Sequence, residues 1–306
     1  MRNGITFKNK HSSAFNVTVR TKSRSFLPEV KRYTYDTPLM NGQYDFSDAN
    51  VYGHEFYSNR VFTVTITVLE SDVFALQKKL SVLGEWLRGC GELKFDDMPY
   101  VKWNARVAES ISSMPEIHGR KAVFDVNFEV EPFSSWIYSV QDGIKIGDDV
   151  EIGLNVPIGL SALYEDTIKK SGNIKVYNAG TWYVKPIITI QNYDDFNIIA
   201  PATTLIYGDN SIKIDLFSAM IMNNTVPIVI DCENQTITAK LQKGDRNLLR
   251  YATVKGNFFD LPPGENVIEI ETDTTSNTSS CKVTVEYIPR FFYDYDYETE
   301  WGVGDA

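Results

Sequence analysis

The clearest pattern in the first half of the chain is an alternation of apolar and polar side chains. Residues 60–70, RVFTVTITVLE, place large apolar side chains at every second position and fill the positions between them mainly with threonine. A period of two that is rich in β-branched residues predicts a strand with one buried face. The predicted buried positions are Phe62, Val64, Ile66 and Val68.

The pattern then changes to spacings of three and four over residues 71–89, which predicts an amphipathic helix packed on the sheet. Ser71 or Asp72 can cap its start, and Gly89 can end it. The predicted buried stripe is Val73, Leu76, Leu80, Leu83 and Leu87, with Trp86 in the core or at its rim.

Two further segments complete the expected sheet of the first half. Residues 92–110 resemble a hairpin whose turn is Asp96-Asp97-Met98-Pro99. Paired carboxylates can serve acid–base chemistry, but this composition is common in turns, which is the interpretation we favour. Residues 121–133, KAVFDVNFEVEPF, again alternate and predict a half-buried strand that Pro132 ends.

The second half contains short apolar runs separated by turn signals at intervals of about eight to twelve residues, which is typical of a β-sandwich. In KGNFFDLPPGENVIEI the tandem prolines exclude a helix and a paired central strand, so the chain must turn there. Gly264 supplies a positive φ, and Asn266, Ile268 and Ile270 form one face of the next strand.

The chain of 306 residues is long enough for two cores. The composition changes near residues 135–140, so we expect one domain over 1–138 and a second over 139–306. The second ends in the acidic, tyrosine-rich FFYDYDYETEWGVGDA. The predicted fold class is mainly β with one major helix.

Charge is divided unevenly between the halves. The net charge is −10, with +1 in residues 1–140 and −11 in residues 141–306. Residues 1–32 carry eight basic residues against the single acid Glu29, which indicates either a partner surface or a solvated strand face. Nucleic acid is the less favoured partner because the acidic remainder repels phosphate. The candidate interaction residues are Arg20, Lys22, Arg24, Lys31 and Arg32.

The sequence predicts no catalytic residue, cofactor or metal. The three histidines and three cysteines lack metal-ligand spacing, and we expect the cysteines to be free, buried thiols. The common nucleotide and hydrolase motifs are absent, and no segment has the length of an apolar membrane span, so we expect a soluble protein made in a cytoplasm. Trp182 and Tyr183 can form a sugar-stacking platform, although aromatic strand residues are more often core.

A family resemblance adds what the patterns leave open. The chain resembles siphophage-type distal tail proteins over nearly its whole length, in NGQYDF (41–46), the strand and helix of 60–87, GELKFDDMPYVKWNARV, FEVEPFSSW, YNAGTWYVKPIITI, VIDCENQTI and GNFFDLPPGENVIEI. The order and spacing of these pieces carry the resemblance. Trp103 departs from it, because tyrosine is expected there, and the acidic end has no counterpart.

The resemblance implies an N-terminal tail-tube-like sheet or barrel domain with a packed helix, and a C-terminal galectin-like sandwich. It implies a six-membered ring that connects the tail tube to the tail tip or baseplate and the host-adsorption apparatus. The implied partners are the tube protein, a hub protein and a receptor-binding protein, with DNA passing through the lumen without specific binding. The implied location is the virion, after assembly in the host cytoplasm and without membrane insertion. A carbohydrate-binding adsorption module and a cell-wall glycoside hydrolase remain alternatives, because acidic residues are abundant and sequence cannot position a carboxylate pair.

Overall fold

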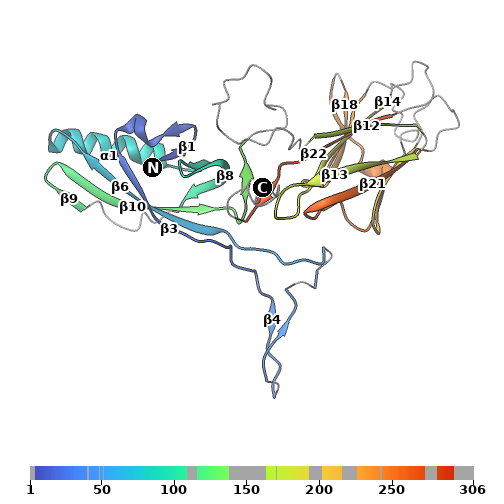
Figure 1. Cartoon of the computed structure of the whole chain (residues 1–306), viewed down its shortest axis with the longest axis horizontal. Coiled ribbons are helices and arrows are strands. Elements are labelled where there is room, and N and C mark those ends of the chain that lie inside the picture. Colours follow the sequence, from blue (N-terminus) through green and yellow to red (C-terminus); the bar gives the residue numbers. More distant parts are fainter. Residues whose placement is uncertain are drawn as a thin grey trace, which may run out of the picture. The chain divides into compact units, whose positions relative to one another are not determined.

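The chain forms two compact units, Met1–Ile137 with Phe291–Ala306 and Tyr138–Arg290 (Figure 1). The computed structural model describes residues 4–39, 41–47, 49–50, 52–108, 116–137, 163–169, 171–192, 202–215, 226–241, 243–272 and 281–292. The predicted division at 138/139 and the acidic end beyond residue 292 lie outside the described residues. The prediction of a mainly β protein with one major helix is confirmed.

The first unit is built on one large sheet with the order β2-β1-β7-β8-β10-β6-β3, to which β9, β11 and β23 attach. The remaining two strands, β4 and β5, form a separate hairpin. The strands are β1 Ile5–Phe7, β2 Lys10–His11, β3 Thr18–Arg24, β4 Thr34–Tyr35, β5 Tyr44–Asp45, β6 Arg60–Leu69, β7 Cys90–Phe95, β8 Met98–Val107, β9 Glu116–His118, β10 Lys121–Val130, β11 Ser134–Trp136 and β23 Arg290–Phe291. A short 3-10 helix covers Ser12–Phe15.

Strand β6 buries the face that its alternation predicts, and each of the four apolar side chains predicted on that face is fully buried. It pairs along its whole length with antiparallel β10, which aligns Phe62 with Phe128 and Val68 with Ala122. The core on the buried face of this sheet is aromatic: the Trp103 ring lies 5.4 Å from Phe62 and 6.0 Å from Phe95 between ring centroids, in edge-on contact with both.

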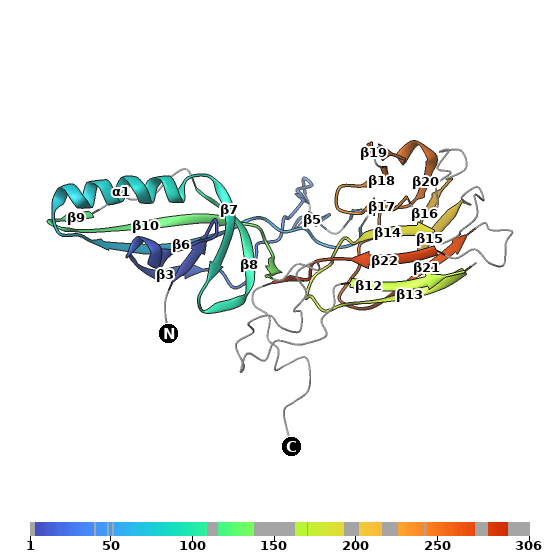
Figure 2. The ribbon, with the colours of Figure 1, turned by 90° about the horizontal axis from the view of Figure 1, so that it is seen from above.

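Helix α1 covers Val73–Leu87 and lies beside β6 and β10 (Figure 2). Asp72 caps it by accepting a 2.8 Å hydrogen bond from the Ala75 N–H. Leu76, Leu83 and Leu87 of the predicted stripe are buried, and so is Trp86, which was predicted in the core or at its rim. The stripe needs correction at its start, because Val73 is exposed and Leu80 is only half-buried. Val73 lies in the first turn of the helix, whereas the Trp86 indole N–H donates a 3.0 Å hydrogen bond to the Phe7 carbonyl.

Two local predictions also change. The hairpin turn is only Asp96-Asp97, because Met98 already pairs with Phe95 and Pro99 lies near the start of β8, where a missing N–H is tolerated. Cys90 is exposed, since it begins β7 directly after the turn that ends the helix. Cys232 and Cys281 are buried as predicted, and burial raises the pKa of their thiols to about 12 and about 11.

The second unit is a β-sandwich of a six-stranded sheet, β12-β22-β14-β17-β18-β19, and a five-stranded sheet, β13-β21-β15-β16-β20. Its core consists mainly of isoleucine, valine, leucine and phenylalanine from both sheets. The strands are β12 Leu163–Ile168, β13 Ser171–Asn178, β14 Ile187–Asn192, β15 Thr203–Tyr207, β16 Asn210–Ile214, β17 Ile228–Asp231, β18 Thr236–Leu241, β19 Gly244–Asn247, β20 Ala252–Lys255, β21 Gly264–Thr272 and β22 Cys281–Glu286, with a 3-10 turn at Leu249–Tyr251.

The Pro-Pro-Gly corner leads directly into β21, which begins at Gly264 with φ +95°. The corner is held by Asn266, whose amide donates to the carbonyls of Pro262 and Gly264 at 3.0 and 2.9 Å and whose oxygen accepts from the Tyr207 hydroxyl at 2.7 Å. The predicted alternation is confirmed, since Asn266, Ile268 and Ile270 are all buried.

Replacing Gly264 with valine is expected to destabilise the second unit by about 1–3 kcal/mol. A Cβ at this position meets nothing within 4 Å, so the expected cost comes from the positive φ alone. Urea unfolding of the full chain measures it. Gly264→Asn is the control, and it should cost less because asparagine adopts positive φ more readily. Equal stability of the valine variant and the parent protein would contradict the prediction.

Candidate interaction surface

The three basic residues of β3 do not share one face, because the strand contains a bulge. The pairing of β3 with β6 shifts between Thr21 and Ser23, so Lys22 is the extra residue. Arg20 lies opposite Thr65, on the face away from the core, whereas Arg24 lies opposite the buried Phe62. A single inserted residue exchanges the two faces of a strand, and it separates Arg20 from Arg24 here.

Arg24 is bound within its own unit. Its guanidinium donates two hydrogen bonds to Asp97, 3.1 Å to Oδ1 and 2.9 Å to Oδ2, and its Cζ lies 4.8 Å from the centroid of the Phe95 ring. The side chain is only 11% exposed. Arg24 therefore fastens the end of β3 to the β7–β8 turn.

Lys22 is paired as well, with Asp125 on β10. This bond from the Lys22 ammonium, followed by a 2.6 Å hydrogen bond from the Thr65 hydroxyl, lowers the pKa of Asp125. Arg20, Lys31 and Arg32 are exposed, and the last two lie beyond the end of β3. The five candidate residues are thus distributed over two faces of β3 and the segment that follows it.

Residues 26–58, called the arm below, leave the sheet after β3 and return to it before β6 (Figure 1). Near the sheet, the Lys31 N–H donates to the Phe56 carbonyl at 2.7 Å, and the Ser58 N–H donates to the Glu29 carbonyl at 2.8 Å. Further out, β4 and β5 pair antiparallel. The arm is therefore a long extended hairpin.

One face of the β4–β5 hairpin is aromatic. Tyr35 lies opposite Tyr44, and the Phe46 N–H donates to the Tyr33 carbonyl at 2.9 Å, so alternate residues of both strands place four rings on one side. This aromatic face consists of Tyr33, Tyr35, Tyr44 and Phe46, which are 52–63% exposed. Sequence reasoning did not identify it, although the alternation in YTYD and YDF is its visible signal.

Several apolar side chains near the start of α1 and on β9 are also exposed. Phe74 is 83% exposed, and Leu69, Val73 and Ile117 are 46–64% exposed. Ile117 on β9 pairs with Ala122, which in turn pairs with Val68 near the end of β6. Leu69 follows the buried Val68 and so lies on the opposite face of the sheet from Ile117, which means that these exposed side chains do not form one patch.

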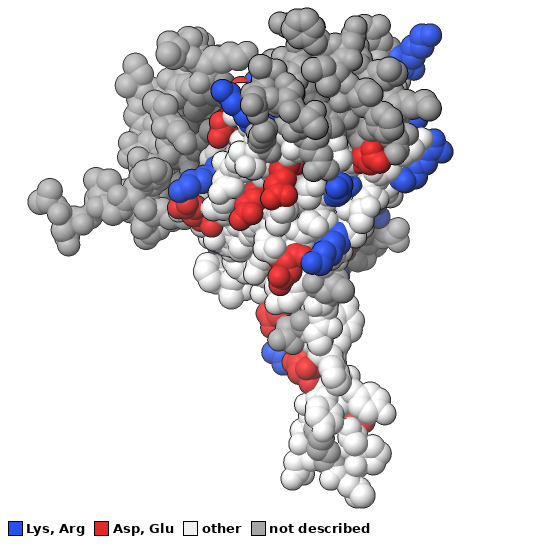
Figure 3. All heavy atoms as spheres, turned by 90° about the vertical axis from the view of Figure 1, so that its right-hand side faces the viewer, with Lys and Arg blue, Asp and Glu red and all other residues white. Residues whose placement is uncertain are grey.

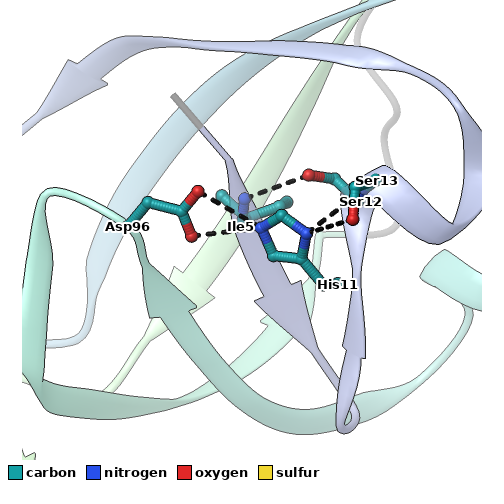
Figure 4. Close-up of polar contacts among 5 residues, drawn as sticks. All are labelled: Ile5, His11, Ser12, Ser13 and Asp96. Atoms are coloured by element: carbon teal, nitrogen blue, oxygen red, sulfur yellow. Dashed lines mark hydrogen bonds and ion pairs between the residues drawn. The ribbon is translucent and has the colours of Figure 1, made fainter. Parts of the chain in front are cut away.

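A separate polar cluster joins the chain's start to the β7–β8 turn (Figure 4). His11 Nε2 lies 3.1 and 3.2 Å from the two carboxylate oxygens of Asp96, and His11 Nδ1 lies 2.6 Å from the Ser13 hydroxyl. The Ser12 hydroxyl accepts a 3.3 Å hydrogen bond from the Ile5 N–H. A side chain on Gly4 would collide with both His11 and Asp96.

The cluster contains serine, histidine and aspartate, the residue types of a hydrolytic triad, but its geometry is that of a structural contact. The Ser13 backbone N–H donates to His11 Nδ1 at 3.2 Å, which makes His11 the cap of the short 3-10 helix. The Nδ1 lone pair is already shared with a backbone donor, so it is a poor base for the Ser13 hydroxyl. The geometry instead ties β1 and β2 to the turn at Asp96.

The described residues offer little for other chemistry. They contain no group of three or more metal-ligating side chains, and no helix among them is long and apolar enough to cross a membrane. Trp182 and Tyr183 are half-buried, and their rings meet at 76° with centroids 5.3 Å apart. Rings at that angle do not form one flat stacking platform.

Comparisons with known proteins bear on both units. Residues 179–291 match the family of the siphovirus-type tail component, C-terminal domain. The fold is similar to the crystal structure of the Dit protein of phage SPP1, with a TM-score of 0.60 at 12% identity, covering 93% of this chain and 98% of that one. Two structures of the phage P2 baseplate, with Ca and with Sr, give TM-scores of 0.40 and 0.39 at 11% identity, covering 93% and 92% of this chain and 98% and 97% of theirs. No curated protein sequence matches the chain.

Proposed function

Since this chain is a siphophage-type distal tail protein, a structural component of the phage tail, we propose that six copies form a ring that connects the tail tube to the tail tip or baseplate and the host-adsorption apparatus. The family match in the second unit and the fold shared with a hub protein of a tail support this proposal. The ring's partners are the tube protein, a hub protein and a receptor-binding protein. DNA passes through the lumen, and assembly takes place in the host cytoplasm.

We assign ring formation to residues 1–138, and we assign residues 139–306 to a galectin-like sandwich that projects outward. The sheet of the first unit supports this division, because β2 and β3 stand at the two ends of its strand order. Unpaired strand edges invite pairing with another chain, and a closed ring removes them. The sandwich acts in contacts with other tail proteins rather than in catalysis.

The basic residues fit the same arrangement. Arg20, Lys22, Arg24, Lys31 and Arg32 lie on the edge strand β3 or just beyond it, where a neighbouring subunit would approach. Exposed charges at a subunit contact steer association and make it sensitive to salt. Arg20, Lys31 and Arg32 supply that exposed charge. Arg24 and Lys22 shape the strand that presents it through their ion pairs within the unit.

Ring formation is tested by native mass measurement and particle imaging of the full chain at high concentration and low salt. Particles of about 208 kDa with sixfold symmetry are expected, six times the 34.7 kDa chain. Arg20→Glu combined with Arg32→Glu should weaken assembly most at low salt, whereas Lys213→Glu in the second unit is the matched control. Monomers alone under all conditions would show that this chain does not close a ring unaided.

A further inference from the structure

The sandwich of the second unit has one side where both of its sheets end. β19 is the last strand in the order of the six-stranded sheet, and β20 is the last strand in the order of the five-stranded sheet. The 3-10 turn Leu249–Tyr251 joins the two strands. In the described part of the chain no strand pairs with the outer side of β19. That side therefore presents backbone groups with which another extended segment can pair.

The direction of the β19 backbone groups follows from its pairing. The Leu248 N–H, at the end of the strand, points toward β18 and donates to the Ile237 carbonyl at 2.7 Å. Because successive N–H groups of an antiparallel strand point to opposite sides, those of Asp245 and Asn247 point away from β18. These two amides are the donors that an added strand would use.

The same side of the sandwich is basic. Residues 240–255 contain five Lys or Arg residues and the single acid Asp245, a net charge of +4, whereas residues 141–306 as a whole carry −11. Arg246 is half-buried and the other four cations are exposed. The five cations, called the basic edge below, are Lys240, Lys243, Arg246, Arg250 and Lys255.

The contacts of the basic edge leave its charge largely available. Lys240 is paired with Asp245. Arg246 and Arg250 both donate to the Tyr251 hydroxyl, Arg246 from Nη2 at 3.3 Å, and Arg250 Cζ lies 4.5 Å from the centroid of the Tyr251 ring. A guanidinium carries five N–H donors, and these bonds engage one nitrogen of each arginine. Two arginines held side by side on one tyrosine are well placed to bind carboxylates.

The charge of this edge selects its partner. Lys and Arg on an edge strand prevent pairing between two copies of that edge, because like charges repel. The same charges favour a strand that carries acids. Asp215 lies beside the edge, since its N–H donates to the Tyr251 carbonyl at 2.9 Å, but one acid does not reverse the sign of the local charge. The expected occupant is therefore an acidic, extended segment.

The chain itself contains such a segment. Residues 293–306, YDYDYETEWGVGDA, carry five acids and no Lys or Arg. From residue 293 to residue 298 tyrosines alternate with acids. A strand formed there would have one acidic and one aromatic face, and tyrosine favours strands.

The acidic segment also begins near the basic edge. Arg290, three residues before it, is paired with Glu233 at 3.1 Å. Glu233 lies in the turn between β17 and β18, and β18 is the strand that pairs with β19. Neighbouring strands are about 4.8 Å apart, and a fully extended segment of this length spans about 46 Å. The segment is long enough to reach the outer side of β19.

The first unit offers the acidic segment less charge. Figure 3 shows the projecting arm as a largely uncharged surface. Exposed cations do lie at and beyond β3, namely Arg20, Lys31 and Arg32. They provide a matched control for the charge of the basic edge.

We propose that the acidic segment, residues 293–306 of this chain, pairs with the outer side of β19 as an added strand and that the basic edge binds its carboxylates. The inference assigns a role to the acidic end, for which the family resemblance has no counterpart. It does not depend on the proposed ring, because the contact is made within one chain.

Amide hydrogen exchange tests the pairing directly. The full chain is compared with a chain that ends at Phe292, which retains every described residue. The amides of Asp245 and Asn247 should exchange at least about tenfold faster in the shortened chain, because they lose their partners. The Leu248 amide, which is bonded to β18, should change much less. Equal exchange of Asp245 and Asn247 in the two chains would overturn the proposal.

Charge reversal tests the recognition. Lys243→Glu combined with Arg250→Glu, in the full chain, should accelerate exchange of the same two amides about as much as the truncation does. Arg20→Glu combined with Arg32→Glu is the control and should leave them protected. Salt at about 1 M, where the screening length is about 3 Å, should also weaken the protection. Protection that survives reversal of the basic edge would show that its charge does not bind the segment.

A free peptide gives a measurement that does not depend on the folding of these variants. A synthetic peptide of residues 293–306, added to the shortened chain, should restore protection of Asp245 and Asn247. The same peptide with its acids replaced by Asn and Gln should not restore it. Equal protection by both peptides, or by neither, would overturn the proposal.

Dilution separates a contact within one chain from one between copies. Protection within one chain is independent of protein concentration, since the segment is tethered to its site. Protection that falls on dilution would place the segment on a neighbouring copy and overturn the proposal as stated. Imaging of the shortened chain keeps the proposed ring a separate result, because ring formation with or without the segment does not alter the exchange of these amides in the monomer.

Discussion

Truncation of Trp103 to alanine is expected to destabilise the first unit by about 3–5 kcal/mol, the range measured for large aromatic residues removed from protein cores. Trp103 is fully buried between Phe62 and Phe95, and the three rings meet edge-on at 5.4 to 6.0 Å. The variant loses these contacts and leaves a cavity that the sheet cannot close. Thermal unfolding of the full chain should show the first unit melting about 10 °C lower, or more.

Two further variants test the explanation. Trp103→Phe should cost less, because phenylalanine keeps most of the packing and removes an indole N–H that is buried without a hydrogen-bond partner in the described part of the chain. Phe74→Ala, at an aromatic residue that is 83% exposed, should change stability little. A loss of less than about 1 kcal/mol for Trp103→Ala would mean that the aromatic core is not closely packed.

The burial of the regular elements follows from sequence pattern alone. In β6 and β10 the apolar side chains alternate with polar ones, and pairing along the whole of both strands keeps that alternation in register. The alternation in β21 was predictable for the same reason, with Asn266 buried because both ends of its side chain are hydrogen-bonded. A period of two fixes the face of each residue as long as no residue is inserted.

The candidate interaction residues show where that rule fails. The bulge at Lys22 reverses the faces of β3, so Arg24 turns toward Phe95 and Asp97 although its spacing from Arg20 predicts a shared face. The contact between His11 and Asp96 joins residues 85 positions apart. Local pattern carries no information about such a pairing, which depends on how β1 and β7 meet in the folded sheet.

The arm illustrates a different limit. Its alternating aromatic residues indicate a hairpin with one apolar face, and the structure places Tyr35 and Tyr44 side by side on it. A sequence pattern states which face is to be covered but not what covers it. For β6 the covering surface lies within the same unit, whereas for the arm no described element supplies it.

Replacement of Arg60 with methionine is expected to loosen the base of the arm while leaving the sheet intact. Arg60 is 3% exposed, and its Nη1 donates to the carbonyls of Ser25 and Phe26 at 3.3 and 3.2 Å. The regular pairing of β3 with β6 ends at Arg24 and Phe62, and the next backbone bond joins Ser58 to Glu29. Between these two points the segments that lead into and out of the arm lack regular strand hydrogen bonds. In that stretch Arg60 supplies a donor to two backbone carbonyls, which are strong acceptors that a buried site must satisfy.

The expected size of the effect follows from the two lost bonds. Both bonds come from the single nitrogen Nη1, at 3.3 and 3.2 Å, so we count them together as one bond from a charged donor, which contributes about 1.5–3 kcal/mol. Methionine retains most of the side-chain packing. Local opening at the base should become easier by about 2 kcal/mol, so the amides of Lys31 and Ser58 should exchange hydrogen roughly thirtyfold faster. Lys22→Met, which removes a cation that is 60% exposed, is the control and should leave both amides protected.

Global unfolding should respond much less than local exchange, because the variant also removes a charge from a buried site. Unchanged protection of Lys31 and Ser58 would show instead that the arm is held by its own backbone bonds and that Arg60 serves only the core.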